Sequence, residues 1–515
     1  MRPGITRRGF LGLSLGSAAA FGLAACGGSG PQNRGSNASG LSVGMKAAIT
    51  SLTPFGIQGY NWSQMMGLAL YDTLVRKDES GKLVPAIAES FDTSDPKVTV
   101  LKIRKGVKFH DGTPMTAKDV AYSISARCDP EVIKQTTGRP VMSPTQFGKV
   151  EVVDDFTVKV HTNERVEFLV DPQPILIVPA DSFGKVNFAN QVVGTGPFKL
   201  ANFVSGSRVD TVANPDYWGG KPPLDKLDFV LFADVATEGV SLRSNQVNAL
   251  YDIAPLYLDQ VKNVPGTRVV SAATYANWWI IQMGKEPLND VRVRKALRYC
   301  FDTKQLNAAS FKGLGKQTWN PFTLTPQTSG VNATDVTYDP ERAKSMLAEI
   351  GKSGISVPLN AIQGYEDCAA QAQIIQQGLQ AAGVKSEIKT LEANAWLEAT
   401  YTKGTWEGLA FNAGNLPFPT KNLFDYMTNP SVMLSAYTNG QPPVPAAAEL
   451  YRQVKTTPFD APEAPGLLAK AEAALVDDAL VYFMFGGPVS LILPEGLNGV
   501  ESNGFGDVFW HKASF

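Results

Sequence analysis

The sequence predicts an α/β protein with more than one domain. Its 515 residues exceed what one ordinary hydrophobic core supports. Strand-like segments alternate with amphipathic helical segments through residues 289–481, which is the arrangement that builds mixed α/β folds. Hydrophobic residues make up 44% of the chain and charged residues 18%, as is typical of soluble globular proteins.

Two helices in this half carry clear boundary signals. Asp339 can cap a helix that has Pro340 at its first position, and Gly351 ends it. The next helix ends at Gly383. The apolar residues with helical spacing that predict the buried faces are Ala343, Met346, Leu347 and Ile350 in the first helix, and Ala372, Ile375, Leu379 and Ala382 in the second.

The stretch RKGVKFHDGTPMTAKDV, residues 104–120, raises the question of a catalytic His110–Asp111 pair. The run His110-Asp111-Gly112-Thr113-Pro114 has the composition of a tight turn. A general base needs a nucleophile or a metal beside it, and the neighbouring residues supply neither. We therefore predict that His110 is a turn residue.

The elements around this turn follow from the same stretch. Residues 98–103 predict a strand, and residues 107–109 predict a second short one. Thr116 and Asp119 have the spacing of a capping box at the start of a helix. Every residue of the stretch thus has a structural explanation.

The first 25 residues are predicted to be an export signal and not part of the fold. A basic start precedes the uncharged, apolar residues 10–25, which are too few and too rich in Gly and Ala for a membrane span. The Arg7-Arg8 pair resembles a twin-arginine signal. Cys26 ends the apolar run LAAC and is the predicted lipid attachment site, with residues 26–42 as a flexible tether. A secreted protein with a chance cysteine is the alternative, which the position of Cys26 disfavours.

The remaining cysteines and the charge balance limit the function further. Cys128, Cys300 and Cys368 allow at most one disulfide within the chain, and Cys300 falls on an apolar helical stripe, so it is predicted to be core. The 47 basic and 48 acidic residues give no electrostatic reason to expect nucleic acid as a partner.

Six segments resemble, in order, the solute-binding proteins (family 5, peptide/nickel/opine type) of ABC importers, from about residue 41 to the C-terminus. The segments are YDTLVRKDESGKLVPAIAESF (71–91), RKGVKFHDGTPMTAKDVAYSI (104–124), VVGTGPFKL (192–200), NPDYWGGKPPLDKLDF (214–229), PLNDVRVRKALRYCFDTKQL (287–306) and YDPERAKSMLAEIG (338–351).

The resemblance implies a two-lobed periplasmic-binding-protein-like fold, type II, of the large peptide-binding class. The expected domains are lobe I (43–283) with a subdomain inserted at about 75–188, lobe II (284–485), and a return to lobe I (486–515). Gly486-Gly487-Pro488 is suited to a hinge, or equally to an ordinary loop.

The resemblance also implies how such a protein works. Ligand bridges both lobes and favours the closed state, which a permease then accepts. The expected partners are a small-molecule ligand, the transmembrane subunits of an ABC permease, and a membrane reached through the lipid on Cys26. The expected state is a monomer on the outer face of the cell membrane, on the periplasmic side if the cell has two membranes.

The substrate is less constrained. Peptide binders of this family commonly hold the free amine on an aspartate in a W-x-A-D-like segment. Residues 409–419, LAFNAGNLPFP, take that place here, and Gly414 stands where the aspartate would be. A buried ammonium needs a counter-charge. Asp425 or Glu366 could replace it, and an end-blocked or cyclic peptide, an opine-like compound or an oligosaccharide fits equally well.

Aromatic and amide side chains near the expected crossings are the candidate ligand contacts. Any one Trp is as readily explained as core. The candidates are Tyr60, Asn61 and Trp62; Tyr275, Asn277, Trp278 and Trp279; Trp396 and Trp406; and Phe411, Asn412, Gly414 and Asn415.

Catalysis and direct metal binding are not expected. His110, His161 and His511 lie far apart in the sequence and outside these segments, so only a chelated metal remains possible. The sequence has no G-x-S-x-G or H-E-x-x-H motif for a secreted hydrolase, and the Asp154-Asp155 and Asp477-Asp478 pairs are read as surface. No cofactor is expected. A surface receptor or adhesin on the same scaffold is the third alternative.

Overall fold

The computed structural model divides the chain into two units, Met1–Asn37 and Ala38–Phe515, and all described residues belong to the second. The described residues are 40–46, 49–55, 65–78, 82–136, 142, 146–163, 169, 175–319, 336–363, 365–392, 395–396, 398–415, 450, 453–454, 457, 461–479, 481–502 and 507–515. No helix among them combines the length and the hydropathy that a membrane span requires.

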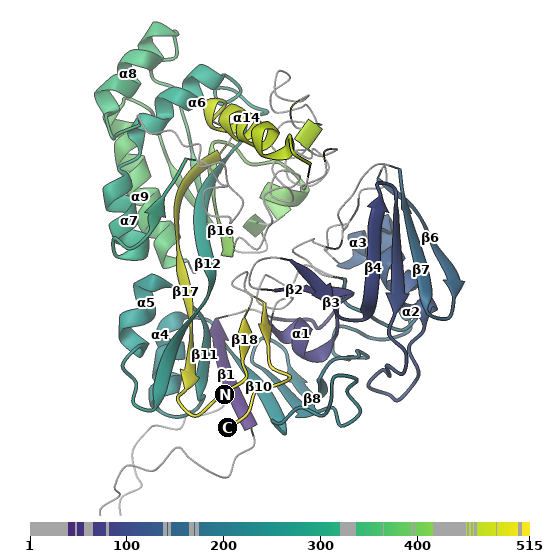
Figure 1. Ribbon diagram of the computed structural model, residues 1–515. Coiled ribbons are helices and arrows are strands. Elements are labelled where there is room, and N and C mark those ends of the chain that lie inside the picture. Colours follow the sequence, from purple (N-terminus) through teal and green to yellow (C-terminus); the bar gives the residue numbers. More distant parts are fainter. Residues whose placement is uncertain are drawn as a thin grey trace, which may run out of the picture. The chain divides into compact units, whose positions relative to one another are not determined.

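Within the described residues, eleven strands form one large mixed sheet (Figure 1). Its neighbouring strands are, in order, β15 (Ile388–Leu391), β14 (Leu359–Ile362), β16 (Leu409–Asn415), β12 (Thr267–Ile281), β17 (Val481–Pro494), β11 (Ala249–Ile253), β1 (Gly40–Lys46), β10 (Lys226–Phe232), β9 (Arg208–Ala213) and β8 (Phe198–Val204), while β13 (Lys316–Gln317) pairs with β17.

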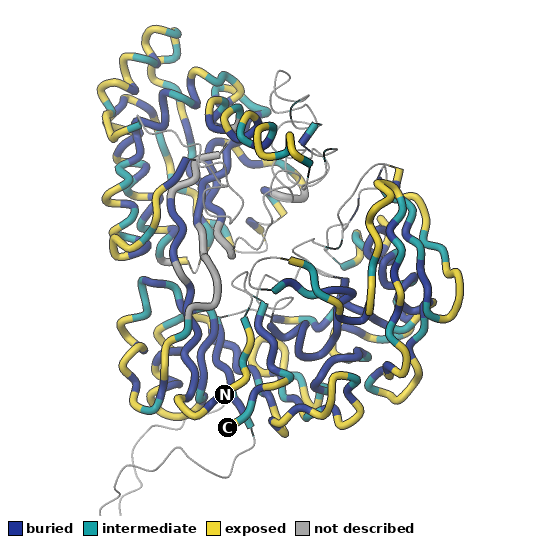
Figure 2. Tube along the Cα trace, in the orientation of Figure 1, coloured by how far each residue is buried: buried dark blue, intermediate teal, exposed yellow. Residues whose placement is uncertain are grey.

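The long antiparallel strands β12 and β17 connect two hydrophobic cores. Their pairing runs from Thr267 opposite Pro494 to Ile280 opposite Val481. Leu491 belongs to the core that also contains strands β1 and β10. Trp279 belongs to the core around helices α6 (Val291–Leu297), α7 (Thr303–Phe311), α8 (Pro340–Glu349) and α9 (Glu366–Ala381). Buried residues follow both strands at these ends (Figure 2). The two strands therefore join one folded body to the other.

The segment Gly486-Gly487-Pro488 is part of strand β17 and not a loop. Gly486 pairs with Ala276 of β12 and also with Lys316 of β13. A Cβ atom on Gly487 would lie 2.6 Å from the Phe311 ring, so glycine is needed there for close packing. The loop alternative is wrong, and the hinge role stays a prediction.

A second sheet belongs to a third hydrophobic core, whose residues run from Leu74 to Ile177. Its strands are β4 (Ala88–Asp95), β5 (Val98–Ile103), β7 (Thr157–Thr162) and β6 (Phe147–Asp154), and helices α2 (Ala117–Ala126) and α3 (Pro130–Thr136) accompany them. The predicted strand at 98–103 is confirmed, but residues 107–109 form only an isolated bridge from Lys108 to Pro114. The Phe109 amide donates to the Thr113 carbonyl, and the Met115 amide donates to the Val107 carbonyl, so the backbone of residues 107–109 is bonded to the turn that follows and not to the sheet.

The helices of the second half begin and end largely as their sequences predict. Asp339 accepts a hydrogen bond from the Arg342 amide at the start of α8, with Pro340 first in the helix. Gly351 and Gly383 have φ of 69° and 75° after the helices that they follow. The helices are α6 (Val291–Leu297), α7 (Thr303–Phe311), α8 (Pro340–Glu349), α9 (Glu366–Ala381) and α14 (Ala464–Asp477), with a 3-10 turn at Arg298–Cys300 and a π turn at Glu398–Thr402.

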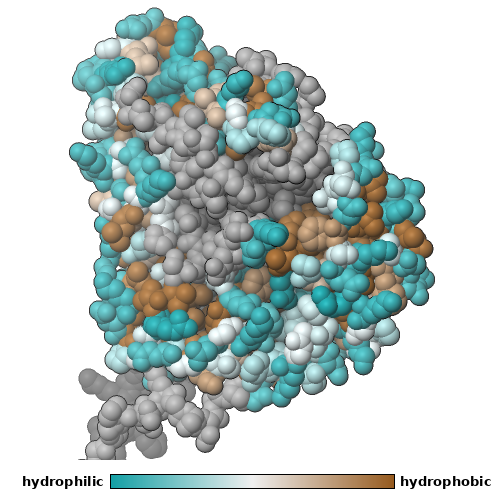
Figure 3. Space-filling view, viewed as in Figure 1, coloured by the Kyte–Doolittle hydropathy of each residue, from teal (hydrophilic) through white to brown (hydrophobic). Residues whose placement is uncertain are grey.

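Burial largely follows the predicted helical faces, although Met346 and Ile350 are only half-buried. Ala372, Ile375 and Leu379 of α9 are fully buried. Ala343 and Leu347 of α8 are buried. Mostly hydrophilic side chains, with a few hydrophobic ones among them, cover the end of the molecule where this helix lies (Figure 3). The smaller elements are α1 (Gly67–Leu70), α4 (Val235–Arg243), α5 (Pro255–Val261), and the strand pairs β2 (Val75–Lys77) with β3 (Leu83–Pro85) and β18 (Glu501–Ser502) with β19 (Val508–Phe509).

Cys128, Cys300 and Cys368 are free and buried. Burial raises the pKa of the Cys300 thiol to about 12, so it remains a neutral core residue as predicted. The three thiols form no disulfide.

Candidate functional site

His110 has a structural role, as the turn chemistry predicts. Its amide donates to the Gly194 carbonyl at 2.8 Å, and its Nε2 lies 3.1 Å from the Gly196 carbonyl. Because a carbonyl only accepts, Nε2 carries the proton. Burial lowers the pKa of His110 to about 4, which keeps the ring neutral. The capping box that follows the turn is also present, with Thr116 and Asp119 each accepting from the backbone of the other.

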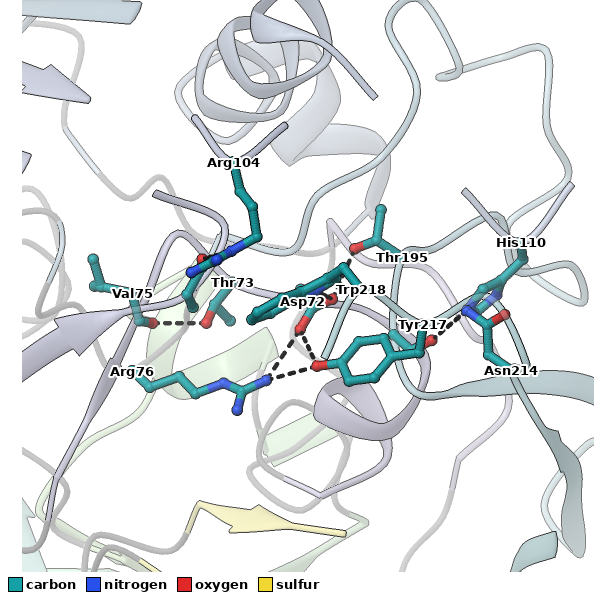
Figure 4. Close-up of polar contacts among 12 residues, drawn as sticks. Asp72, Thr73, Val75, Arg76, Arg104, His110, Thr195, Asn214, Tyr217 and Trp218 are labelled. Atoms are coloured by element: carbon teal, nitrogen blue, oxygen red, sulfur yellow. Dashed lines mark hydrogen bonds and ion pairs between the residues drawn. The ribbon is translucent and has the colours of Figure 1, made fainter. Parts of the chain in front are cut away.

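The main polar network among these motifs is centred on Asp72, which the sequence did not single out (Figure 4). Its carboxylate is 1% exposed. The groups that contact it are Arg76 Nη2 at 3.2 Å, Tyr217 Oη at 3.0 Å, Trp218 Nε1 at 2.8 Å and Thr195 Oγ1 at 3.2 Å. These partners come from three of the family-like segments, so the network explains why the segments occur together.

The charge and hydrogen bonds around Asp72 indicate that its role is to hold these segments together, and we call this role the Asp72 lock. Burial raises the pKa of Asp72, and Arg76 and the three hydrogen-bond donors oppose that shift. Arg76 also donates to the Tyr217 hydroxyl at 2.9 Å. A carboxylate satisfied by four groups of its own chain has little capacity left for a ligand, so we do not place the solute here.

The predicted ligand segments lie side by side in the large sheet. β12 pairs antiparallel with β16, with Asn277 opposite Ala413, Trp278 opposite Asn412, and Trp279 opposite Phe411. Tyr275 and Gly414 are also in this ladder, opposite Asn415 and Ala276. Segments more than 130 positions apart are thus joined.

The tryptophans have structural roles in this structure. Trp279 is fully buried, and its Nε1 donates to Gln371 of α9 at 2.9 Å. Trp396 and Trp406 are buried in the same core. Phe411 packs edge-on against Trp279, with ring centroids 5.6 Å apart. Contact of these rings with a solute stays a prediction.

The other candidates are placed less fully. Trp278 and Asn412 are buried neighbours across the β12–β16 ladder. Tyr60, Asn61 and Trp62 lie outside the described residues, as do Cys26 and Asp425. Tyr275, Gly414 and Asn415 are described only by their backbone pairing. Glu366 is the first residue of α9.

The large sheet contains two groups of parallel strands. β1 is parallel to β10 and β11, and β14 is parallel to β15 and β16. Ligands of open α/β sheets bind outside the carboxyl ends of strands. Lys46 ends β1, and its Nζ lies 4.6 Å from the ring centroid of Tyr365, which follows β14. The carboxyl ends of the two groups therefore meet at this contact.

We name the polar residues around this contact the carboxyl-end cluster. Glu238 is in the first turn of α4, Asp252 is near the end of β11, and Asp367 is in the first turn of α9. Asn277 Nδ2 donates to Asp367 Oδ2 at 3.4 Å. The members are Lys46, Glu238, Asp252, Asn277, Tyr365 and Asp367.

Burial and neighbouring charges shift the pKa values of two cluster residues, Glu238 and Tyr365. Burial raises the pKa of Glu238 well above its usual value, Asp252 raises it further, and Lys46 opposes the shift. Burial, with smaller contributions from Asp252 and Asp367, raises the pKa of the Tyr365 hydroxyl to about 12. No group of three or more His, Cys, Asp or Glu within the described ranges has a geometry for a metal ion.

Sequence reasoning missed Asp72, Lys46, Asp252 and Asp367. The available signal for Lys46 and Asp252 was a charged residue near the end of a strand, but neither of these two strands was predicted from the sequence. Asp72 and Asp367 carried no local signal, because their partners are distant in the sequence.

The chain has the two-lobed fold of periplasmic binding proteins of the peptide-binding class. It belongs to the bacterial extracellular solute-binding proteins, family 5, whose model matches residues 82–434. Members of this family are binding proteins of transport systems and not enzymes.

Several curated proteins are similar. A dipeptide-binding protein of Escherichia coli is 29% identical over 64% of this chain and 67% of its own length. A heme-binding protein A of Haemophilus influenzae is 30% identical over 65% and 68%. A periplasmic oligopeptide-binding protein of E. coli is 26% identical over 84% of each chain.

Solved structures share the fold at lower identity. A binding protein from A. tumefaciens R10 in complex with agropinic acid has a TM-score of 0.80 at 22% identity, covering 92% of this chain and 98% of its own. An oligopeptide-binding protein of Bacillus subtilis in complex with a nonapeptide has 0.78 at 20%, covering 91% and 96%.

Proposed function

We propose that this protein is the extracytoplasmic substrate-binding lipoprotein of an ABC importer. It captures a peptide or peptide-like solute between two lobes and delivers it, chemically unchanged, to the permease. The observation that carries the proposal is the family match over residues 82–434. The relatives named for dipeptide and oligopeptide binding favour a peptide-like solute.

The proposed attachment rests on sequence alone. Residues 1–25 are the signal peptide, Cys26 carries the lipid, and residues 26–42 tether the folded body as a monomer to the outer face of the cell membrane. A two- or three-chain anchor is required for stable attachment, because one acyl chain binds a membrane only marginally.

The proposed lobes are residues 43–283 with 486–515, and residues 284–485. The separate core of Leu74 to Ile177 supports an inserted subdomain at about 75–188. Strands β12 and β17 support crossings near Met283 and Gly486, because each strand carries the chain from one core to the other. Solute that touches both lobes stabilises the closed state, since only that state offers both sets of contacts.

The ligand class is open to a direct test. The solved neighbours hold agropinic acid, a nonapeptide and a nickel–histidine complex, so the fold alone does not select one. An oligosaccharide or a receptor role on the same scaffold are the competing outcomes.

A thermal-shift screen against free peptides, end-blocked peptides, opines, oligosaccharides and nickel–histidine tests the proposal. A ligand at a hundred times its dissociation constant stabilises the folded protein by about 2.7 kcal/mol. We expect a peptide or opine to give the largest shift. A largest shift from an oligosaccharide would contradict the peptide-like assignment, and uptake that survives deletion of the protein's own gene would contradict the importer role.

A further inference from the structure

Helices α5 and α7 belong to different hydrophobic cores and contact each other directly. Val261 of α5 is in the core that contains Leu250 and Ile492. Phe311 of α7 is in the core around helices α6 to α9. The first of these cores lies in the proposed lobe I and the second in the proposed lobe II. The contact between α5 and α7 is therefore a place where the two proposed lobes touch.

Both helices pack on strand β17 at Gly487. A Cβ atom on Gly487 would lie 2.6 Å from the Phe311 ring and 3.5 Å from Pro255, the first residue of α5. Phe311 and Pro255 thus meet at a position without a side chain, in one of the two strands that connect the cores. A rotation of one lobe against the other about these strands must change this contact.

The Asp259 carboxylate joins the two helices by ion pairs next to this contact. Lys312 Nζ donates to Asp259 Oδ2 at 2.6 Å, and Lys262 Nζ lies 2.6 Å from Asp259 Oδ1. Asp259 is one helical turn after Pro255, and Lys312 directly follows Phe311. Hydrogen bonds from the two ammonium groups lower the pKa of Asp259 to about 2, so it is charged at neutral pH. We name Asp259, Lys262 and Lys312 the α5–α7 ion triad.

Asn307 holds the loop that carries Lys312. Lys312 follows α7 in the left-handed conformation, with φ of 51°, and its amide donates to the Asn307 carbonyl. The Asn307 side chain accepts from the Gly315 amide at 3.0 Å and donates to the Gly315 carbonyl at 2.8 Å. Because the loop is bonded at both ends, no further ordering of its backbone is needed to present Lys312 to α5.

The ion triad and the predicted ligand segments lie on opposite sides of the connecting strands. Helices α5 and α7 lie to the left of β12 and β17, and strands β16 and β1 lie to their right (Figure 1). A rotation about the connecting strands that closes the right side opens the left side. Closure on a solute therefore separates α5 from α7.

We propose that the α5–α7 ion triad is a latch that favours the open arrangement of the lobes, and that closure on a solute breaks the Asp259–Lys312 pair. This inference rests on the proposed capture of solute between two lobes and adds a contact that opposes closure. An exposed ion pair is weak. It is sufficient here, because a small free energy changes the ratio of two states of similar stability. Loss of the pair should raise the ratio of closed to open protein about threefold.

The test measures the distance between the lobes in the full-length protein without solute. Lys118→Cys on α2 and Lys470→Cys on α14 provide exposed positions for spin labels, and pulsed electron paramagnetic resonance gives the distribution of distances between them. Both helices lie to the right of the connecting strands, so closure shortens this distance (Figure 1). Cys26→Ser prevents labelling at the predicted lipid site. The three cysteines of the described residues are buried and stay in place.

Three variants and a matched control examine the ion triad. Lys312→Met and Asp259→Asn each remove one charge and should each raise the short-distance population about threefold. The double variant Asp259→Lys with Lys312→Asp exchanges the charges and should restore the wild-type distribution. Lys295→Met is the control, because Lys295 is 37% exposed, against 36% for Lys312, and pairs with Asp477 at 2.8 Å. Its helix α6 and the partner helix α14 belong to one core, so this variant should leave the distribution unchanged.

The outcomes separate the latch from the proposed function. Unchanged distributions in Lys312→Met and Asp259→Asn with wild-type thermal midpoints, or an equal shift in Lys295→Met, would overturn the latch and leave solute capture in place. A ligand from the thermal-shift screen should bind Lys312→Met about threefold more tightly than wild type, since affinity follows the population of the closed state. Equal affinities would also overturn the latch. A screen without any ligand would overturn solute capture, while the distances measured without solute still test the latch.

Discussion

At the scale of single residues, buried charge in the Asp72 network fixes the positions of distant segments. Asp72 and Thr195 are 123 positions apart, and Asp72 and Trp218 are 146 apart. The sequence shows each segment separately, but hydrogen bonds between distant residues leave no periodic signal. This is why the sequence identified the segments and missed the residue that joins them.

Replacing Asp72 tests the lock. Asp72→Asn leaves Arg76 without its counter-charge, and we expect a loss of about 3 kcal/mol in the free energy of unfolding. The lower end of the range for buried pairs applies because the Arg76 side chain is 16% exposed. Chemical denaturation measures the change. Asp216→Asn, at an exposed position of the same NPDYW segment, is the control and should change stability by less than about 0.5 kcal/mol. Equal midpoints for both variants would refute the lock.

His110 predicts a pH dependence of stability. Its pKa is about 4 in the folded protein and about 6.5 in the unfolded chain, so the unfolded state binds more protons between these values. Folding stability should therefore fall as the pH falls from 6.5 towards 4. The expected contribution between pH 7.5 and 5 is about 2 kcal/mol.

The variant His110→Gln isolates this contribution, because it keeps a donor for the Gly196 carbonyl and cannot titrate. Denaturation curves at pH 7.5 and pH 5 should show a smaller loss for the variant than for wild type. Equal losses in the two proteins would show that the pKa of His110 is not lowered by folding, which would contradict this prediction. His511, whose pKa is also lowered to about 4 by burial, remains in both proteins and cancels in the comparison.

At the scale of elements, local signals were sufficient for helices and insufficient for the long strands. The caps of α8 and α2 depend on residues within one turn, so their sequences specify them. Strand β17 includes Gly486-Gly487-Pro488, which locally resembles a hinge or a loop. Pairing with β12, more than 200 positions away, makes it a strand.

Close packing between elements gives a prediction at Gly196. A Cβ atom there would lie 2.5 Å from the carbonyl carbon of Leu70, the last residue of helix α1, and backbone cannot move aside as a side chain can. Gly196→Ala should cost about 1–3 kcal/mol. Gly466→Ala is the matched control, because its Cβ would meet nothing within 4 Å in helix α14. That control should raise stability by up to about 1 kcal/mol. Thermal melts of the two variants that shift in the same direction would contradict this packing.

At the scale of the whole molecule, the family and fold were predicted from ordered segments, while the ligand contacts stay predictions. The segments containing Asn277 and Phe411 do lie together, in one ladder. Their tryptophans are core residues, which aromatic content alone cannot distinguish from ligand contacts. The meeting of two sets of strand ends is a tertiary feature, so the contact between Lys46 and Tyr365 could not be predicted from the sequence.

The central claim is that the protein holds a small solute without changing it. Isothermal titration calorimetry with the best ligand from the thermal-shift screen, followed by mass spectrometry of the recovered solute, tests this claim most directly. We predict saturable binding of one solute per chain and recovery of that solute with its mass unaltered. A solute recovered with a changed mass, or a titration with no saturable heat, would contradict the account.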